Sequence, residues 1–121
     1  MVAPHLFPCV TVLRSGHSVD ILAPDVSKLA VVKRISEIAT CSESEVLCIG
    51  DQGCWPGNDH ALLGTPLSLS SNVVSADPER CWNLAPAGVR ESQATLGYLQ
   101  LLKRSQDAVR FSLPSLSRKR T

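Results

Sequence analysis

The sequence lacks any long hydrophobic run, and this absence excludes a membrane-spanning helix. Nowhere do about 18 apolar residues follow one another, the length that a bilayer requires. The first 13 residues carry no cluster of positive charge, and Pro4 and Pro8 interrupt their apolar residues. We therefore expect neither a membrane partner nor a signal peptide.

The sequence also lacks an excess of charge of either sign and lacks closely spaced pairs of cysteines. The 121 residues carry 12 Lys and Arg against 11 Asp and Glu, so no chain-wide field attracts nucleic acid or an anionic membrane surface. The five cysteines include no CxxC pair, which argues against a disulfide framework and against a zinc finger. A reduced, cytoplasmic compartment suits such cysteines, and we expect Cys48, inside an apolar run, to be a small buried hydrophobe.

The first third of the chain predicts a hairpin followed by a helix. Two extended runs, residues 6–13 and 18–23, are separated by four residues that contain Ser-Gly, which is typical of a β-hairpin. In residues 27–40, apolar side chains recur at spacings of three, four and seven, so we expect an amphipathic helix with Ser27 as its N-cap and Lys28 first in the helix. The apolar residues expected to pack onto a sheet are Val31, Val32, Ile35, Ile38 and Ala39.

The stretch from residue 46 to residue 59 runs from an apolar strand into an acidic turn. The four apolar residues 46–49 predict a strand covered on both faces, as in a parallel sheet. Asp51 follows at the strand end, where ligand sites of open α/β sheets lie. Asn58 and Asp59 open a short helix that ends near Gly64, so we expect the three polar side chains to converge as hard oxygen ligands for Mg²⁺.

The second half of the chain is less regular. Residues 67–70 alternate in polarity and predict another short strand, and residues 71–88 predict a long, ordered loop around Trp82. Helical spacing returns at residues 91–104, and after Gln106 the Ser-, Arg- and Pro-rich sequence predicts fraying. Ala94, Tyr98, Leu101 and Leu102 share one side of this predicted helix, and Lys103 and Arg104 end it.

Three elements in this order resemble the third and fourth motifs of the haloacid dehalogenase (HAD) superfamily of Mg²⁺-dependent phosphohydrolases. They are Lys28 ahead of a helix, Gly50-Asp51 at a strand end, and Asn58-Asp59 beyond it. The resemblance spans roughly residues 17–65, and residues 18–28 look like the return from a C2-type cap to the core. It implies an α/β fold, a partial Rossmann-like core whose parallel sheet has flanking helices.

The resemblance also implies three parts of the chain and a role for each motif residue. A cap-remnant β-hairpin would occupy residues 1–24, the C-terminal half of the core residues 25–104, and a disordered basic, Ser-rich tail residues 105–121. Lys28 would neutralise the phosphoryl oxygens and the attacking aspartate. Asp51 would ligate Mg²⁺, and Asp59 with Asn58 would hold or orient the metal, directly or through water. The implied substrate is a phosphorylated small molecule.

The chain departs from the family pattern in two places. The family's nucleophile motif, Asp-x-Asp, is absent, and seven residues separate Asp51 from Asp59, more than is typical of the family. The implied function is therefore a phosphatase fragment with negligible turnover alone. One alternative is a non-catalytic association module, which uses a free sheet edge for self-association or to bind a complementing N-terminal half. The other is a truncated product that folds poorly.

Each candidate residue also has a purely structural interpretation. Asp51 could cap a neighbouring helix or bind water, and Asn58 could be a plain N-cap. Lys28 could be a solvated surface lysine. Three further residues of the region are expected to have structural roles only. Trp55 would pack the turn, His60 would be exposed on a helix, and Cys54 would be an inert thiol.

Overall fold

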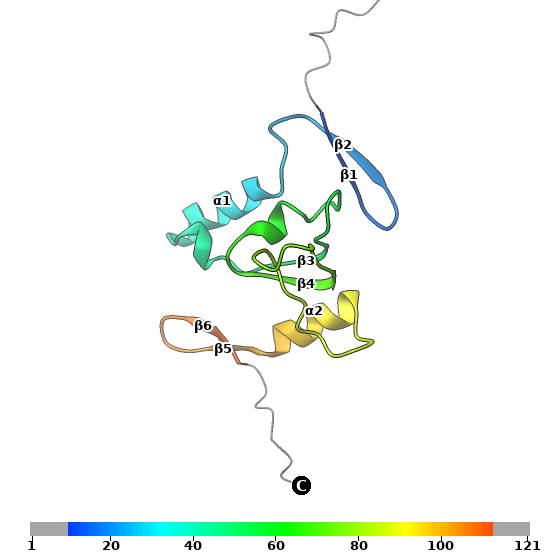
Figure 1. Cartoon of the computed structure of the whole chain (residues 1–121). Coiled ribbons are helices and arrows are strands. Elements are labelled where there is room, and N and C mark those ends of the chain that lie inside the picture. Colours follow the sequence, from blue (N-terminus) through cyan, green and yellow to red (C-terminus); the bar gives the residue numbers. More distant parts are fainter. Residues whose placement is uncertain (1–9, 113–121) are drawn as a thin grey trace, which may run out of the picture. The chain divides into compact units, whose positions relative to one another are not determined.

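The structure is a computed structural model that describes residues 10–112, and the chain divides into two compact units, Met1–Leu84 and Ala85–Thr121 (Figure 1). The coarse prediction of an α/β protein is confirmed, because helices alternate with small sheets and strands β3 and β4 are parallel. The boundary between the two units lies between residues 84 and 85, inside the predicted core of residues 25–104 and inside the predicted long loop.

The first unit opens with the predicted β-hairpin. Strands β1 (Thr11–Arg14) and β2 (Val19–Leu22) pair antiparallel, and the Ser15 hydroxyl accepts backbone N–H bonds from the turn residues 17 and 18. The hairpin is fixed to a later loop through Arg14, whose N–H donates to the Pro56 carbonyl and whose carbonyl accepts the Asn58 N–H, both at 2.9 Å. The part of the first predicted run at residues 6–9 lies outside the described residues.

Helix α1 (Leu29–Ala39) lies within the predicted range but begins one residue later than predicted. Lys28 is the N-cap, so the prediction of Ser27 as N-cap is wrong. The Ser27 hydroxyl instead accepts the Leu29 N–H from just outside the helix, at 3.2 Å. After the C-cap Thr40, a 3₁₀ turn, η2 (Glu43–Glu45), leads the chain into the central strand.

The buried face of α1 includes only one residue of the predicted apolar stripe. Val32 and Ser36 are buried, and Ser36 satisfies its hydroxyl at the Lys33 carbonyl, 2.7 Å away. The other residues of the stripe are exposed to solvent. The exposed fractions are 58% for Val31, 44% for Ile35 and 69% for Ile38.

The centre of the first unit is a parallel pair of strands, β3 (Cys48–Gln52) and β4 (Ser68–Val73). Cys48 is buried, as predicted, and the strand predicted at residues 67–70 is confirmed as the first part of β4. The connection contains a 3₁₀ turn, η3 (Leu62–Gly64), whose Leu63 is completely buried. Because β3 extends to residue 52, Asp51 lies inside the strand rather than beyond it.

The long loop after β4 is irregular and ordered, as predicted. The Ser70 N–H donates to the Trp82 carbonyl at 2.8 Å, which forms an isolated bridge to β4. The Trp82 indole N–H donates to the Pro78 carbonyl at 2.9 Å. Cys81, between these contacts, is buried.

The second unit consists of α2 (Glu91–Gln100), β5 (Leu102–Arg104) and β6 (Val109–Phe111). Ala94 and Tyr98 are buried, as predicted. The helix ends four residues earlier than predicted, so Lys103 and Arg104 lie in a strand and do not face the helix C-terminus.

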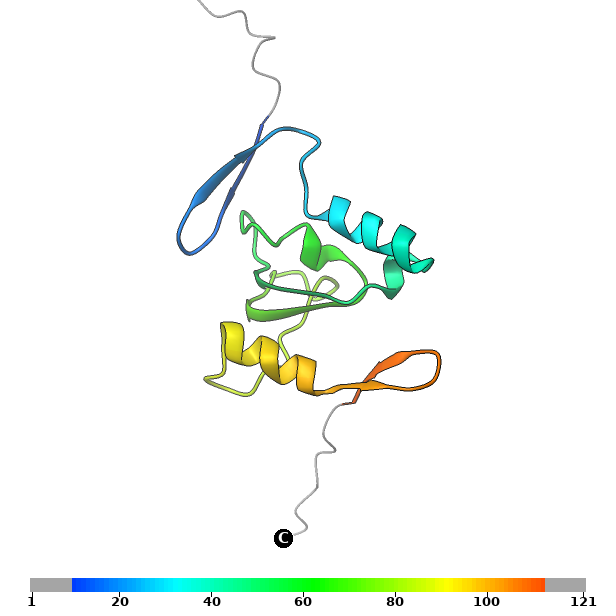
Figure 2. The ribbon, with the colours of Figure 1, turned by 180° about the vertical axis from the view of Figure 1, so that it is seen from behind.

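Strands β5 and β6 form a hairpin directly after α2 (Figure 2). The Ser105 N–H donates to the Ala108 carbonyl at 2.8 Å and closes its turn. The Phe111 ring lies 6.1 Å from the ring of Tyr98. The prediction of fraying after Gln106 is therefore wrong for residues 109–111, and residues 113–121 lie outside the described residues.

Candidate functional site

Three of the four predicted site residues meet at the carboxyl end of β3. Lys28 precedes α1, Asp51 belongs to β3, and Asp59 follows the loop after β3. The Lys28 ammonium forms an ion pair with Oδ1 of Asp59. Oδ2 of Asp59 accepts the backbone N–H groups of Asp51 at 2.8 Å and of Gln52 at 3.1 Å. Asp59 is only 4% exposed, so its carboxylate is a buried charge that three donors satisfy.

Two glycines allow the carboxylate to approach the strand so closely. A Cβ atom on Gly50 would lie 2.7 Å from Cγ and Oδ2 of Asp59. Gly57 closes the loop, with its N–H donating to the Cys54 carbonyl at 2.6 Å. The Asp59 N–H then donates to the Gln52 carbonyl at 3.2 Å. The residues between Asp51 and Asp59 therefore fold into a compact turn despite their number.

The environment drives the pKa values of the two aspartates apart. Burial would raise the pKa of Asp59, but the Lys28 ammonium and the backbone N–H groups of Asp51 and Gln52 outweigh burial and hold the pKa below its ordinary value. Burial raises the pKa of Asp51, and the neighbouring Asp59 carboxyl raises it further. Asp59 is thus the stable anion, and Asp51 is the carboxyl that gains most from an added cation.

Asn58 does not cap a helix, so that prediction is wrong. The N-cap of η3 is Ala61, three residues later, and it makes no side-chain capping hydrogen bond. The Asn58 N–H is instead held by the Arg14 carbonyl of the hairpin. Its side-chain oxygen Oδ1 is buried and has no hydrogen-bond partner among the described residues. Asn58 lies beside Lys28 in the lining of a cavity.

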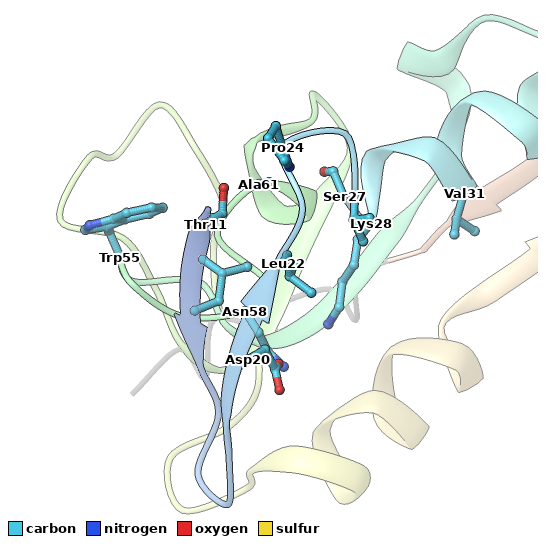
Figure 3. Close-up of a pocket in the computed structure, with 12 residues that line it drawn as sticks. Thr11, Asp20, Leu22, Pro24, Ser27, Lys28, Val31, Trp55, Asn58 and Ala61 are labelled. Atoms are coloured by element: carbon cyan, nitrogen blue, oxygen red, sulfur yellow. The ribbon is translucent and has the colours of Figure 1, made fainter. Parts of the chain in front are cut away.

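This cavity lies between the hairpin, the start of α1 and the loop after β3 (Figure 3), and has a volume of about 460 Å³. Trp55 is drawn at one end of the lining and Val31 at the other. Asp20, which was not among the predicted site residues, also lines the cavity. The alternation of β1 and β2 could have identified it, because alternate hairpin residues share a face. That face is formed by Thr11, Leu13, Asp20 and Leu22.

Trp55 and His60 differ from their predicted structural roles. Trp55 is 61% exposed, so packing of its indole is not what holds the loop. His60 is half-buried rather than exposed, and its Nδ1 lies 3.0 Å from the Gly53 carbonyl, to which it can donate. The His60 ring lies edge-on to the indole, with the two centroids 5.4 Å apart. His60 therefore has its hydrogen-bonding capacity directed into the loop.

The carboxylates fit a magnesium ion only if it keeps most of its water. Within residues 10–112 no group of three or more His, Cys, Asp or Glu side chains could hold a metal ion. Asp59 is already engaged by three donors, which leaves Asp51 as the carboxylate able to ligate Mg²⁺ directly. Asp59 and Asn58 could hold its water ligands, an arrangement that suits Mg²⁺ because this ion gives up water reluctantly.

Comparisons with known proteins add no relative. No protein-family model matches the chain, and no curated protein or solved structure matches it. None of the helices described in residues 10–112 has the length and apolar character needed to cross a membrane.

Proposed function

We propose that this chain is the C-terminal half of a HAD-like, Mg²⁺-dependent phosphoric-ester hydrolase, acting in the cytoplasm and with negligible turnover alone. The observation that supports the proposal is the meeting of Lys28, Asp51 and Asp59 at the carboxyl end of a parallel strand. The negative charge of a phosphoryl group needs positive charge to offset it. The ammonium group supplies such charge, a metal ion held by the carboxylate would add to it, and the buried anion fixes the ammonium in place.

Each residue of this cluster has a separate task. The Lys28 side chain is 47% exposed, and an ammonium has three donors, so it can pair with Asp59 and still donate to a phosphoryl oxygen. Asp51 would hold Mg²⁺, which supplies positive charge to the phosphoryl oxygens when bound. Asp59 positions the Lys28 ammonium and fixes the backbone of β3.

The missing part is the nucleophile. The aspartates of the chain include no Asp-x-Asp pair, so the covalent step of the proposed chemistry has no attacking carboxylate at the motif position. A second candidate function follows from this gap, namely an association module that receives a complementing N-terminal half or a second copy. It is favoured by the exposed stripe of α1 and by β3, which pairs only with β4 among residues 10–112.

A phosphatase assay tests the proposal. We expect no turnover of an aryl phosphate with Mg²⁺ above that of Asp51→Asn. We also expect inorganic phosphate to raise the thermal unfolding midpoint, because a ligand that binds the folded state stabilises it. Lys28→Met should abolish this increase, whereas Lys33→Met, an exposed lysine on α1, should retain it.

Two results would contradict the proposal. Turnover that Asp51→Asn abolishes would show that the chain is a complete enzyme. Phosphate binding that survives Lys28→Met would show that the cluster is not a phosphoryl site. Sedimentation velocity addresses the second candidate function, since a monomer at all concentrations would exclude self-association.

A further inference from the structure

The cavity beside the Lys28–Asp59 pair carries charges of both signs. The Asp20 carboxylate from β2 and the Lys28 ammonium both line it, together with the amide of Asn58 (Figure 3). Most of the remaining wall is apolar, and its larger apolar residues are Leu13, Leu22, Pro24, Val26, Val31 and Trp55. A cavity of about 460 Å³ with a few polar groups on an apolar wall is typical of small-molecule sites.

One charged acceptor in this lining has room for a further donor. Asp20 accepts the Ser18 hydroxyl at 3.2 Å through one oxygen, which leaves capacity on the carboxylate. Asp20 is therefore suited to a ligand that brings N–H or O–H groups.

The charges around the cavity favour an N–H donor that carries a positive charge over a neutral O–H donor. The Lys28 ammonium pairs with Asp59, whereas Asp20 forms no ion pair among the described residues. A phosphate bound at Lys28 alone would therefore leave the Asp20 carboxylate without a cation. A ligand with a positive group at the Asp20 end would compensate for this charge, and a protonated amine supplies three charge-assisted donors.

We propose that this cavity binds a phosphate monoester that carries a protonated amine on a short hydrocarbon chain. The phosphate lies at Lys28, the amine at Asp20, and the carbon chain against the apolar wall between them. This inference rests on the proposed function for its phosphate end. Its amine end rests on Asp20, which belongs to β2 and not to the element that carries Lys28.

Binding of three matched esters tests the inference. In the Trp82→Phe chain, Trp55 is the remaining tryptophan, and its emission reports on the cavity it lines. The probes are aminobutyl phosphate, hydroxybutyl phosphate and pentyl phosphate, which differ only in the terminal group. We expect aminobutyl phosphate to bind about tenfold more tightly than pentyl phosphate, with the hydroxyl ester between them.

Variants of two aspartates assign the preference. Asp20→Asn should reduce the advantage of the amine to less than about threefold, whereas Asp25→Asn, an exposed aspartate outside the lining, should keep it. Circular dichroism spectra that match those of the unchanged chain will show that both variants fold. An amine advantage that survives Asp20→Asn would overturn the inference.

The remaining outcomes separate this inference from the proposed function. Equal affinities for all three esters, with Lys28-dependent phosphate binding retained, would overturn the amine site and leave the phosphoryl site intact. No binding of any ester or of inorganic phosphate would overturn both. Vesicles of phosphatidylethanolamine present a primary amine on a two-carbon chain of a phosphodiester, and we expect no response to them. A response to these vesicles without binding of the free ester would refute the assignment to a soluble monoester.

Discussion

Replacing Asp59 by alanine is expected to destabilise the first unit by about 3 kcal/mol at neutral pH. The substitution removes the acceptor of the Asp51 and Gln52 N–H groups and the partner of Lys28. The half-exposed Lys28 ammonium can return to water, so most of the loss comes from backbone donors left without an acceptor. Denaturant unfolding of both proteins under the same conditions measures the difference.

Two comparisons make this prediction specific. Asp25→Ala, at an exposed turn position, should change the free energy of unfolding by less than about 0.5 kcal/mol. Asp59→Asn should lose less than Asp59→Ala, because the amide oxygen can still accept one of the N–H bonds. An Asp59→Ala protein as stable as Asp25→Ala would show that the carboxylate does not hold β3.

The same substitution has a defined pH dependence. The folded-state pKa of Asp59 is lowered, so its contribution is fully present above the unfolded-state pKa and is lost as the pH falls through the folded-state value. The stability difference between the unchanged chain and Asp59→Ala should therefore shrink below about pH 4.

Gly57→Ala is the second change expected to have a large effect, about 3 kcal/mol of destabilisation. A Cβ atom at residue 57 would lie 2.6 Å from the Cys54 carbonyl oxygen and closer still to that of Gln52. Both atoms belong to the backbone of the turn, so neither can move without opening it. The turn positions Asp59 and receives the hairpin through Asn58, and both contacts would weaken.

Gly16→Ala is the matched control, because a Cβ atom there meets nothing within 4 Å. We expect it to leave the free energy of unfolding unchanged or to raise it slightly, since alanine restricts the unfolded chain. Denaturant unfolding of the two variants provides the test. A Gly57→Ala protein that unfolds at the same denaturant concentration as Gly16→Ala would show that the turn is not closely packed around residue 57.

The central strand and the meeting of its acids could be predicted from the sequence because both depend on local signals. The apolar residues 46–49 indicated a strand, but β3 begins at Cys48 and only Cys48 in it is buried, so the predicted cover on both faces is wrong. The glycines of the following turn indicated a compact loop. Gly50 carries information of its own, since the absence of a side chain there is what admits the Asp59 carboxylate. The predicted compact turn therefore agrees with the tertiary structure, in which Asp59 also pairs with Lys28.

The errors arose where tertiary neighbours decide. The spacing of α1 identifies an apolar stripe, but no pattern within the helix indicates whether another element covers it, and Ile38 lies exposed. Asn58 has the residue type of an N-cap, yet the Arg14 carbonyl of a distant hairpin holds its N–H. Lys103 continues the helical spacing of residues 91–100, but it lies in strand β5 instead. There it pairs with Arg110 of β6, seven residues further along the chain.

The site outside the acidic turn was predicted least well for the same reason. Asp20 reaches the cavity because Arg14 binds the hairpin to the loop at two backbone positions. Neither contact involves a side chain, so the sequence could show which hairpin residues share a face with Asp20 but not that this face meets the loop. The exposed indole of Trp55 likewise depends on how that loop meets the hairpin.

The most direct test of the central claim is a carboxyl-carbon NMR titration of Asp51 and Asp59 in the folded chain. We expect Asp59 to titrate below the ordinary pKa of an aspartate, because the Lys28 ammonium and the backbone N–H groups of β3 outweigh its burial. We expect Asp51 to titrate above the ordinary pKa, because of its burial and the neighbouring Asp59 carboxyl. In Lys28→Met the pKa of Asp59 should rise. Two aspartates that both titrate at the ordinary value, unaffected by Lys28→Met, would contradict the account.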